Sequence, residues 1–373
     1  QTATLKYNGV KFEIQDGNSL CYLEGEPVTA YAYYAPNRRW RNGSLDFKDI
    51  FGNPNGTAEF LEATCTVHYG DNNYVDISFA NATRNYSRLR IATIPKTEIK
   101  VDADNFAPTD NPNLLYMTYT LTSDEKGNAY LYGTFDNNSI VTVKYRGASL
   151  ATHKFSKKTE NAKSYALDAT VISANSAEEI YSAIKQEIAD GKTAIRLNLA
   201  SDAGDNEFNA IREAFENVRG YGTIDLTLIG CKEIPVNGLY RIMALKSITL
   251  PDVTKIRMDA LSSCLYLQEI CAPNVSAIDE YAFGKCRYLR KVTLGKLTDV
   301  RGEANSRSGI FDDINDLYPD IDLYLPKNQE VMEFDENSKQ YIWKPTGENY
   351  FAIPDSDNGI FLGYQFKSVK SWE

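Results

Sequence analysis

The chain contains few of the side chains that enzymes most often use for proton transfer or nucleophilic attack. Of its 373 residues only two are histidines, His68 and His153, and six are cysteines. Cys65 and His68 lie three positions apart in a stretch expected to be a strand, where an odd separation places side chains on opposite faces. The sequence also lacks the serine-hydrolase, zinc-protease, nucleotide-phosphate and dinucleotide motifs. We therefore expect a protein that is not an enzyme and that uses no metal or cofactor.

Long hydrophobic runs and an excess of positive charge are missing as well. No stretch approaches the ~18 consecutive apolar residues that a membrane-spanning helix requires. The formal net charge is −10 and the pI is about 5.0, which disfavours nucleic acid as a ligand because the phosphate backbone would be repelled. The chain opens at Gln1 without the basic and apolar segments of a signal peptide, so we expect that any such peptide was removed or never present.

The most informative feature that is present is a repeat of 22 residues in the C-terminal half. A repeat of this length and leucine spacing predicts a leucine-rich solenoid with one strand in each coil. Cys264 and Cys286 recur at the same step, and we expect them to be small buried side chains in the coil interior. The apolar positions that recur at this step are Leu245, Leu267 and Leu289; Ile248, Ile270 and Val292; Leu250, Ala272 and Leu294; Val253, Val275 and Leu297; and Ile256, Ile278 and Val300.

The segments on either side of the repeats carry the features of end caps. Ser176 and Glu179 form the pattern of a capping box, and it is followed by isoleucines four apart on one helical face. A second helix is predicted from about Asn206 to a stop at Gly220. These elements predict an α/β N-terminal cap over residues 175–222. After Val300 the repeat degrades, and an aromatic tail is expected to close the other end.

The first 160 residues have a different character, rich in Tyr, Thr, Asn and Gly. Short alternating runs between turn residues predict strands, and Asn8-Gly9 predicts a hairpin. Many short strands without a helical pattern predict an all-β sandwich over 1–160. The fold class is therefore multidomain, with this sandwich followed by an α/β leucine-rich repeat solenoid over 175–373. Whether Cys21 and Cys65 pair is left open by the sequence.

The repeats resemble a known family, the BspA-like leucine-rich repeat, whose pattern is roughly L-x-x-I-x-L-P-x-x-V-x-x-I-x-x-x-A-F-x-x-C. Two segments carry the resemblance, Leu245 to Cys264 and Leu267 to Cys286. Ala282-Phe283-x2-Cys286 matches the end of the pattern fully, whereas the preceding coil has Leu261 in place of phenylalanine. The resemblance covers roughly residues 175–373. It implies a secreted or surface-anchored protein of the kind found in Bacteroidetes, several of which are described as adhesins.

The first domain has a shorter resemblance. The run from Lys126 to Tyr132, the strand Val141-Thr142-Val143 and the run from Lys163 to Leu167 look like the close of a fimbrillin-type N-terminal β-domain. This resemblance implies a module that takes part in pilus assembly.

Two surfaces are candidates for ligand binding. The first is the loop Arg38-Arg39-Trp40-Arg41, whose three arginines around a tryptophan could stack on a sugar or bind an anionic partner. The alternative interpretation is a solvated loop whose Trp40 folds back onto a sheet. We place most of the binding energy in this loop, because Trp and Arg dominate measured hot spots.

The second surface is the outward side of the solenoid strands. Ile248 and Leu250 point inward, so the residue between them and its equivalents in the next coils are expected to point outward. Such a small, polar face could dock a protein or could simply be solvated. The residues assigned to it are Thr249, Cys271 and Thr293, with Glu269 and Lys291 beside them.

These observations favour a non-enzymatic cell-surface or secreted binding protein that is adhesin-like, with a host or matrix protein or a glycan as its ligand. The first alternative is a structural or accessory pilus subunit. The second is a carbohydrate-active enzyme, because 50 acidic residues leave room for a catalytic carboxylate pair. We expect a monomer located outside the cell or at the outer-membrane surface, with no nucleic-acid partner and no membrane span in this chain.

Overall fold

The computed structural model describes residues 87–108, 113–160, 163–302, 309–311, 320–343 and 359–372, together with the backbone of seven strands before residue 80. It divides into two compact units. Unit 1 comprises Gln1–Val143 and Ala151–Thr170, and unit 2 comprises Lys144–Leu150 and Val171–Glu373. No helix among the described residues is long and apolar enough to span a membrane.

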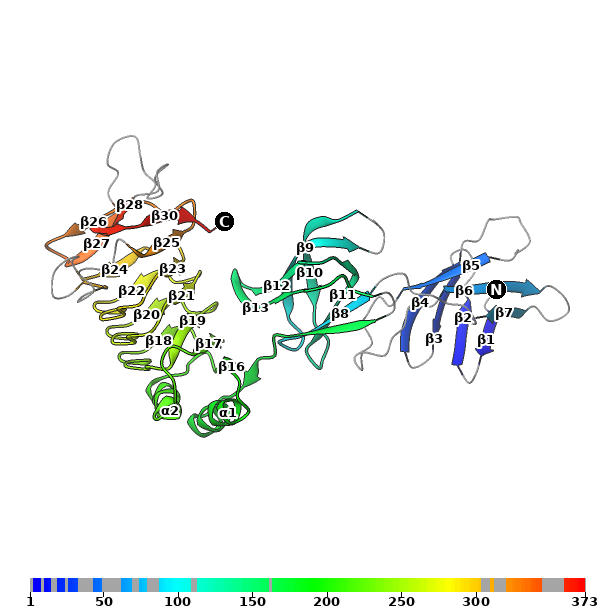
Figure 1. Cartoon of the computed structure of the whole chain (residues 1–373), viewed down its shortest axis with the longest axis horizontal. Helices are drawn as coiled ribbons and strands as arrows, with labels where there is room; N and C mark the ends of the chain where they lie inside the picture. Colours follow the sequence, from blue (N-terminus) through cyan, green and yellow to red (C-terminus); the bar gives the residue numbers. More distant parts are fainter. Residues whose placement is uncertain are drawn as a thin grey trace. The chain divides into compact units, whose positions relative to one another are not determined.

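The first part of unit 1 consists of two antiparallel sheets (Figure 1). In the smaller sheet Tyr7 pairs with Val10, so the two strands flank Asn8-Gly9 as the hairpin prediction requires. The larger sheet has the strand order β3-β4-β5-β6-β7. The strands are β1 (Ala3–Tyr7) and β2 (Val10–Ile14) in the first sheet, and β3 (Ser19–Leu23), β4 (Glu26–Ala32), β5 (Gly43–Lys48), β6 (Glu62–His68) and β7 (Tyr74–Ser78) in the second. The side chains of Cys21 and Cys65 lie outside the described residues.

A seven-stranded sheet follows along the chain, with the order β13-β12-β9-β11-β8-β14, in which β10 also pairs with β9. Leu89, Val101, Phe106 and Phe135 are fully buried and form its core. Thr159 anchors the segment after β13, because its hydroxyl accepts hydrogen bonds from the Phe135 amide and the Ser87 hydroxyl. The strands are β8 (Ser87–Ala92), β9 (Glu98–Pro108), β10 (Leu115–Thr122), β11 (Asn128–Phe135), β12 (Ile140–Tyr145), β13 (Ala148–Lys154) and β14 (Ser164–Asp168).

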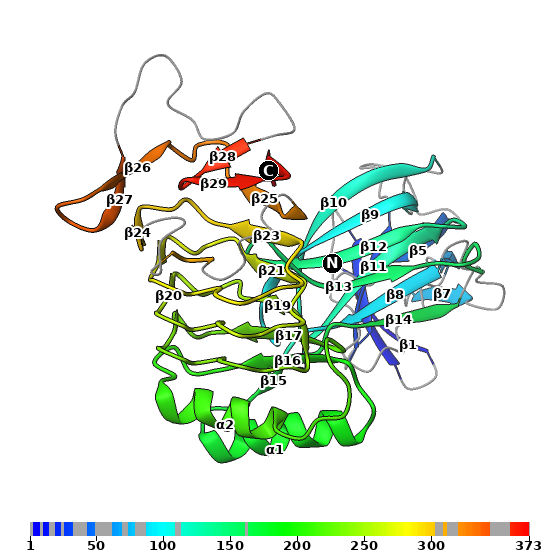
Figure 2. The same ribbon diagram turned by 60° about the vertical axis from the view of Figure 1, so that its left-hand side comes forward.

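Unit 2 is built around two sheets whose strands come from successive coils. Figure 2 shows the coils stacked from the two helices at one end to β28–β30 at the other. The eight-stranded sheet contains β15 (Ile172–Ser173), β16 (Ala194–Asn198), β17 (Ile224–Ile229), β19 (Leu245–Thr249), β21 (Glu269–Ala272), β23 (Lys291–Leu294), β25 (Asp322–Leu325) and β30 (Ser368–Ser371). The six-stranded sheet contains β18 (Glu233–Ile234), β20 (Lys255–Ile256), β22 (Ala277–Ile278), β24 (Asp299–Arg301), β27 (Gln340–Trp343) and β26 (Met332–Asp335). A hairpin, β28 (Gly359–Phe361) and β29 (Tyr364–Phe366), completes the unit.

The strand register follows the 22-residue repeat. Ile248 pairs with Ile270, Ile270 with Val292, and Val292 with Leu323, all in parallel. These four side chains are buried in one continuous hydrophobic core, as the inward assignment predicts. Because each strand lies over the equivalent strand of the preceding coil, a repeated apolar position becomes an unbroken row of buried side chains.

The repeated cysteines and Phe283 lie inside the coils. The Cys264 and Cys286 thiols donate to the carbonyls of Leu239 and Leu261, at 3.0 and 3.2 Å. Phe283 is fully buried, and its ring centroid lies 5.4 Å from that of Phe311. The expectation that the repeated cysteines are small interior side chains is therefore confirmed.

Two helices lie at the start of unit 2, α1 (Ala177–Ala189) and α2 (Asp205–Phe215). The Ser176 hydroxyl accepts from the Glu179 amide at 3.3 Å, while the Glu179 carboxylate accepts from the amide of Asn175 at 2.7 Å. The second bond of the predicted capping box therefore goes to the residue before the cap. At the start of α2 the Gly204 amide donates to the Glu207 carboxylate, so this helix begins close to the predicted position without a capping side chain.

Candidate functional site

The two surfaces predicted to bind a ligand differ in what the structure says about them. Arg38, Arg39, Trp40 and Arg41 lie outside the described residues, so binding by that loop stays a prediction. The residues of the second predicted surface lie on neighbouring strands of the eight-stranded sheet, on the side opposite the buried row. They are Thr249, Glu269, Cys271, Lys291 and Thr293. We call this side the outer face. It consists of two rows, the first with Asp225, Ser247, Glu269, Lys291, Asp322 and Ser368, and the second with Arg196, Thr227, Thr249, Cys271, Thr293, Tyr324 and Lys370.

The first row of the outer face is a chain of polar pairs between adjacent strands. The Lys291 ammonium lies 2.6 Å from the Glu269 carboxylate and 5.7 Å from the centre of the Tyr324 ring. The Ser247 hydroxyl donates to Asp225 at 2.6 Å, and Ser368 donates to Asp322 at 2.5 Å. These pairs hold the side chains of the row in fixed positions across the sheet.

Two charged groups of the first row have shifted pKa values, Lys291 and Asp322. Partial burial alone would lower the pKa of Lys291, but the hydrogen bond and negative charge of Glu269 outweigh it and raise that pKa. Burial alone would raise the pKa of Asp322, but hydrogen bonds from Ser368 and Lys367 lower it. Both groups are therefore held in their charged forms. This row offers fixed charges of both signs to a ligand.

The second row is less accessible than the sequence predicts. Thr249 and Cys271 are half-buried, but Thr293 is only 7% exposed, so the expectation that Thr293 is an open contact position is wrong. Strands in a sheet lie ~4.8 Å apart, and the short Thr293 side chain stands between Cys271 and the larger Tyr324 on the two adjacent strands. Burial raises the pKa of the Cys271 thiol to about 11, which keeps it protonated and weakly nucleophilic.

Charged residues on the six-stranded sheet form a second ladder, which the sequence reasoning missed. Arg257, Asp279 and Arg301 are 22 residues apart, and Asp279 lies 3.7 Å from each arginine. Arg257 also pairs with Glu233 at 2.6 Å. The alternation of sign at the repeat step was the available signal. These charges pair with one another between successive coils, as Glu269 and Lys291 do on the outer face.

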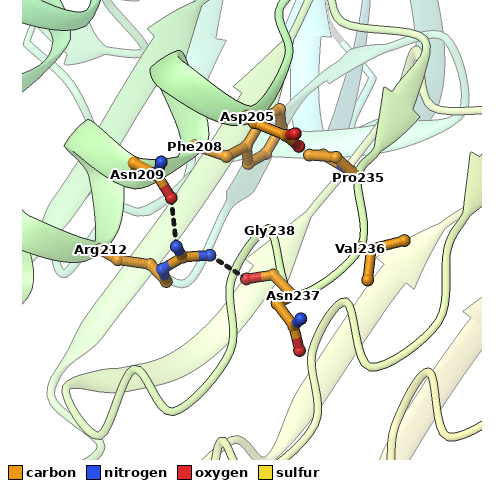
Figure 3. A pocket seen from close by; sticks show the side chains of 8 residues that line it. All are labelled: Asp205, Phe208, Asn209, Arg212, Pro235, Val236, Asn237 and Gly238. Carbon is orange, nitrogen blue, oxygen red and sulfur yellow. Dashed lines mark hydrogen bonds between the residues drawn. The ribbon is translucent and has the colours of Figure 1, made fainter.

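A pocket of about 340 Å³ opens between α2 and the loop that follows β18 (Figure 3). Arg212 reaches across it, and its guanidinium donates to the Asn237 carbonyl and to the Asn209 side chain. The Arg212 guanidinium at the centre of the pocket is therefore hydrogen-bonded to other residues of the protein. The remaining wall is formed by Asp205, Phe208, Pro235, Val236 and Gly238.

The described residues contain no group of three or more His, Cys, Asp or Glu side chains that could hold a metal ion. The thiols of Cys231 and Cys264 have their pKa raised to about 12 by burial, so they are poor nucleophiles. In the described part of the chain, the candidate site is therefore the outer face, which carries exposed charged side chains of both signs.

Comparison with known proteins agrees with the repeat assignment. Residues 209–310 match the model of the BspA type leucine rich repeat region in six copies. The match begins within α2 and ends beside Phe311, so it covers the regular coils. No curated protein and no solved structure matches the chain. The repeats are therefore of the BspA type, and repeats of this kind suggest a role in protein interaction or surface binding.

Proposed function

We propose that this chain is a non-enzymatic binding protein, secreted or displayed at the cell surface, which attaches to a host or matrix protein. In this proposal residues 175–373 act as a leucine-rich repeat solenoid with an α/β cap, and the outer face is the contact surface. The observation that carries the proposal is the Glu269–Lys291 pair together with its neighbours in the first row. It places fixed charges of both signs on one sheet face.

The geometry of the outer face suits recognition of a folded or extended protein surface. The side chains of Glu269 and Lys291 are 42% and 45% exposed, so they can reach a partner while they remain paired. Paired charges fixed on adjacent strands determine which partner surfaces match, because a like charge placed opposite costs several kcal/mol. The BspA-type repeats provide independent support, since repeat stacks commonly use such extended faces for binding.

The proposal can be tested with an array of extracellular host proteins and glycans probed with the full chain. We expect the full chain to bind to proteins on the array. We expect Lys291→Glu to reduce its affinity for them at least about tenfold, because that change places two carboxylates side by side. The matched control is the double variant Glu269→Lys with Lys291→Glu, which restores a pair of opposite sign. If binding required only an ion pair at these two positions, in either orientation, the double variant would regain the affinity that Lys291→Glu loses.

Two results would argue against the proposal. Protein ligands whose affinity is the same for wild type and Lys291→Glu would move the contact surface elsewhere, and the Arg38–Arg41 loop would then be the next site to mutate. Binding only to glycan spots would replace a protein ligand with a carbohydrate. Turnover of a glycan substrate by the wild-type chain would show that the protein is an enzyme.

A further inference from the structure

Three tyrosines form a stack on the turns that lead into the strands of the eight-stranded sheet. The Tyr221 and Tyr266 rings are 4.9 Å apart and inclined by 5°, and the Tyr266 and Tyr288 rings are 5.3 Å apart and inclined by 9°. Tyr266 and Tyr288 are 22 residues apart, one on each of two successive coils. The intervening coil has the small residue Ala244 at this position, which leaves space for Tyr221.

The turn that presents Tyr221 is shaped for this stack. Gly220 and Gly222 flank the tyrosine, and both have positive φ angles, +101° and +60°. A Cβ atom at Gly222 would lie 3.0 Å from the Cβ of Tyr266, which is a tight contact, and the positive φ also favours glycine there. Tyr221 is nevertheless 65% exposed and Tyr288 is 51% exposed. The stack is thus fixed in position by the backbone while its ring edges face solvent.

The same turns carry positive charge without compensating negative charge. Residues 217–224, 239–248, 261–268 and 283–290 contain no Asp or Glu, in a protein whose net charge is −10. Their basic residues are Arg219, Arg241, Lys246, Lys285, Arg287 and Arg290. Among the described residues, no carboxylate lies within ion-pair distance of Arg219, Arg241, Lys246, Arg287 or Arg290. We call this surface, with its three tyrosines and these five cations, the tyrosine edge.

Two of the cations, Lys246 and Arg290, lie at equivalent positions of coils that are in register. The Gln268 amide donates to the Lys246 carbonyl at 2.7 Å, and the Arg290 amide donates to the Gln268 carbonyl at 2.8 Å. Lys246 and Arg290 are therefore in one row, two positions after the tyrosine row. The Arg290 guanidinium is held by the carbonyls of Leu289 and Arg287, at 2.8 and 3.5 Å. All five cations of the edge are exposed.

The ring spacing determines which partners fit. A planar base or sugar inserted between two rings would need about 7 Å between them, which is two contact distances of ~3.5 Å. At 4.9 and 5.3 Å the rings leave no such space. The stack offers exposed ring edges and phenol hydroxyls, and the turns that carry the stack also carry guanidinium and ammonium groups. These groups match carboxylates, which accept from hydroxyls and pair with arginine.

We propose that the tyrosine edge binds an extended, acidic segment of the partner protein. The proposal rests on the function proposed above and adds the chemistry of the partner and a second contact surface. An extended chain places alternate side chains on one face, so its Asp or Glu residues can follow the hydroxyl row and reach Lys246, Arg287 and Arg290. Tyr and Arg are also the residues most enriched among binding hot spots.

The test uses the full chain and a fluorescein-labelled peptide of about twelve alternating Glu and Ala residues, which spans the edge at ~3.4 Å per residue. Fluorescence anisotropy measures its affinity. We expect wild type to bind this peptide and not a Lys–Ala peptide of equal length, and we expect added salt to weaken the binding. Arg287→Glu with Arg290→Glu is expected to weaken it at least about tenfold.

Two further variants separate the edge from general effects of charge and folding. Lys157→Glu with Lys158→Glu reverses two exposed lysines of unit 1 and changes the net charge equally, so it is expected to leave peptide affinity within about twofold. Tyr221→Phe with Tyr288→Phe keeps the rings and removes two hydroxyls. It is expected to weaken binding at least about threefold without changing the melting curve.

The proposal is overturned if wild type does not bind the acidic peptide at low salt, or if both charge-reversal pairs weaken binding equally. It is also overturned if polyuridylate RNA or an acidic polysaccharide binds and the peptide does not. These outcomes differ from failure of the proposed function. If array ligands depend on Lys291 but not on Arg287 and Arg290, the outer face is a binding surface and the tyrosine edge is not.

Discussion

The Lys291 ammonium lies 2.6 Å from the Glu269 carboxylate, and the two residues are directly opposite each other on β23 and β21. Both side chains are more than two-fifths exposed, so water and salt screen their attraction. The pair therefore contributes mainly to the shape and charge of the outer face, and only slightly to the stability of the sheet.

The first prediction concerns this pair. A double-mutant cycle with Glu269→Gln and Lys291→Met, measured by urea unfolding, is expected to give a coupling energy below about 1 kcal/mol. A half-exposed pair gains little because the two side chains lose conformational freedom when they pair. A coupling energy above about 2 kcal/mol would mean that the pair is much less accessible to solvent than the structure shows.

The second prediction compares the interior of a coil with its outer face. Phe283→Ala removes a fully buried ring that contacts Phe311, and it is expected to cost about 3–5 kcal/mol of unfolding free energy. Thr249→Ala is the control, because Thr249 points outward and is half-buried; it should cost less than about 0.5 kcal/mol. Urea unfolding of the full chain, followed by circular dichroism, measures both. Equal losses would contradict the assignment of inside and outside.

The third prediction is a dependence of stability on pH. Burial raises the pKa of Cys231 and Cys264 from an ordinary value of 9.0 to about 12, and it raises the pKa of Cys286 as well. Above pH 9 the unfolded state loses these protons while the folded state keeps them. Stability from these thiols is therefore intact below pH 9 and is lost as the pH rises towards 12, by up to about 1.4 kcal/mol per thiol and pH unit.

This pH dependence can be separated from that of other groups by a variant. Cys264→Ala with Cys286→Ala has no thiol at two of the three positions, so its unfolding free energy should fall less steeply between about pH 9 and 10.5. Lysines and tyrosines titrate in the variant and in wild type alike, so their contribution to the pH dependence cancels when the two slopes are compared. An identical slope for the variant and wild type would show that the thiols are accessible to solvent in the folded state.

The fourth prediction concerns the glycine beneath the tyrosine stack. Gly222→Ala is expected to destabilise the fold by more than Gly191→Ala, and to weaken acidic-peptide binding. Both glycines have a positive φ, which costs a non-glycine residue about 1–2 kcal/mol. A Cβ at Gly191 would meet nothing within 4 Å, whereas one at Gly222 would press on Tyr266. Thermal melts compare the two variants, and equal shifts would show that the turn relaxes freely.

The sequence alone determined the coil. Side chains that recur every 22 residues must occupy equivalent positions in a stack, so the inward places of Ile248, Leu250 and Cys264 followed from periodicity and were confirmed. The hairpin at Asn8-Gly9 and the first helix were equally local, since turn geometry and a capping pattern specify them without distant contacts. The outer face was predictable for the same reason, except for the accessibility of Thr293.

Only the tertiary structure decided what depends on contacts between residues with no fixed spacing. Gln329, in the part where the repeat degrades, is buried; its side-chain oxygen accepts from the Leu297 amide at 2.6 Å and its side-chain nitrogen donates to the Leu297 carbonyl at 3.2 Å. Tyr221 joins Tyr266 across 45 residues because Ala244 leaves room for it. Periodicity predicts the positions of residues that repeat. These contacts each occur once, so the repeat pattern could not predict which of the unrepeated residues come together.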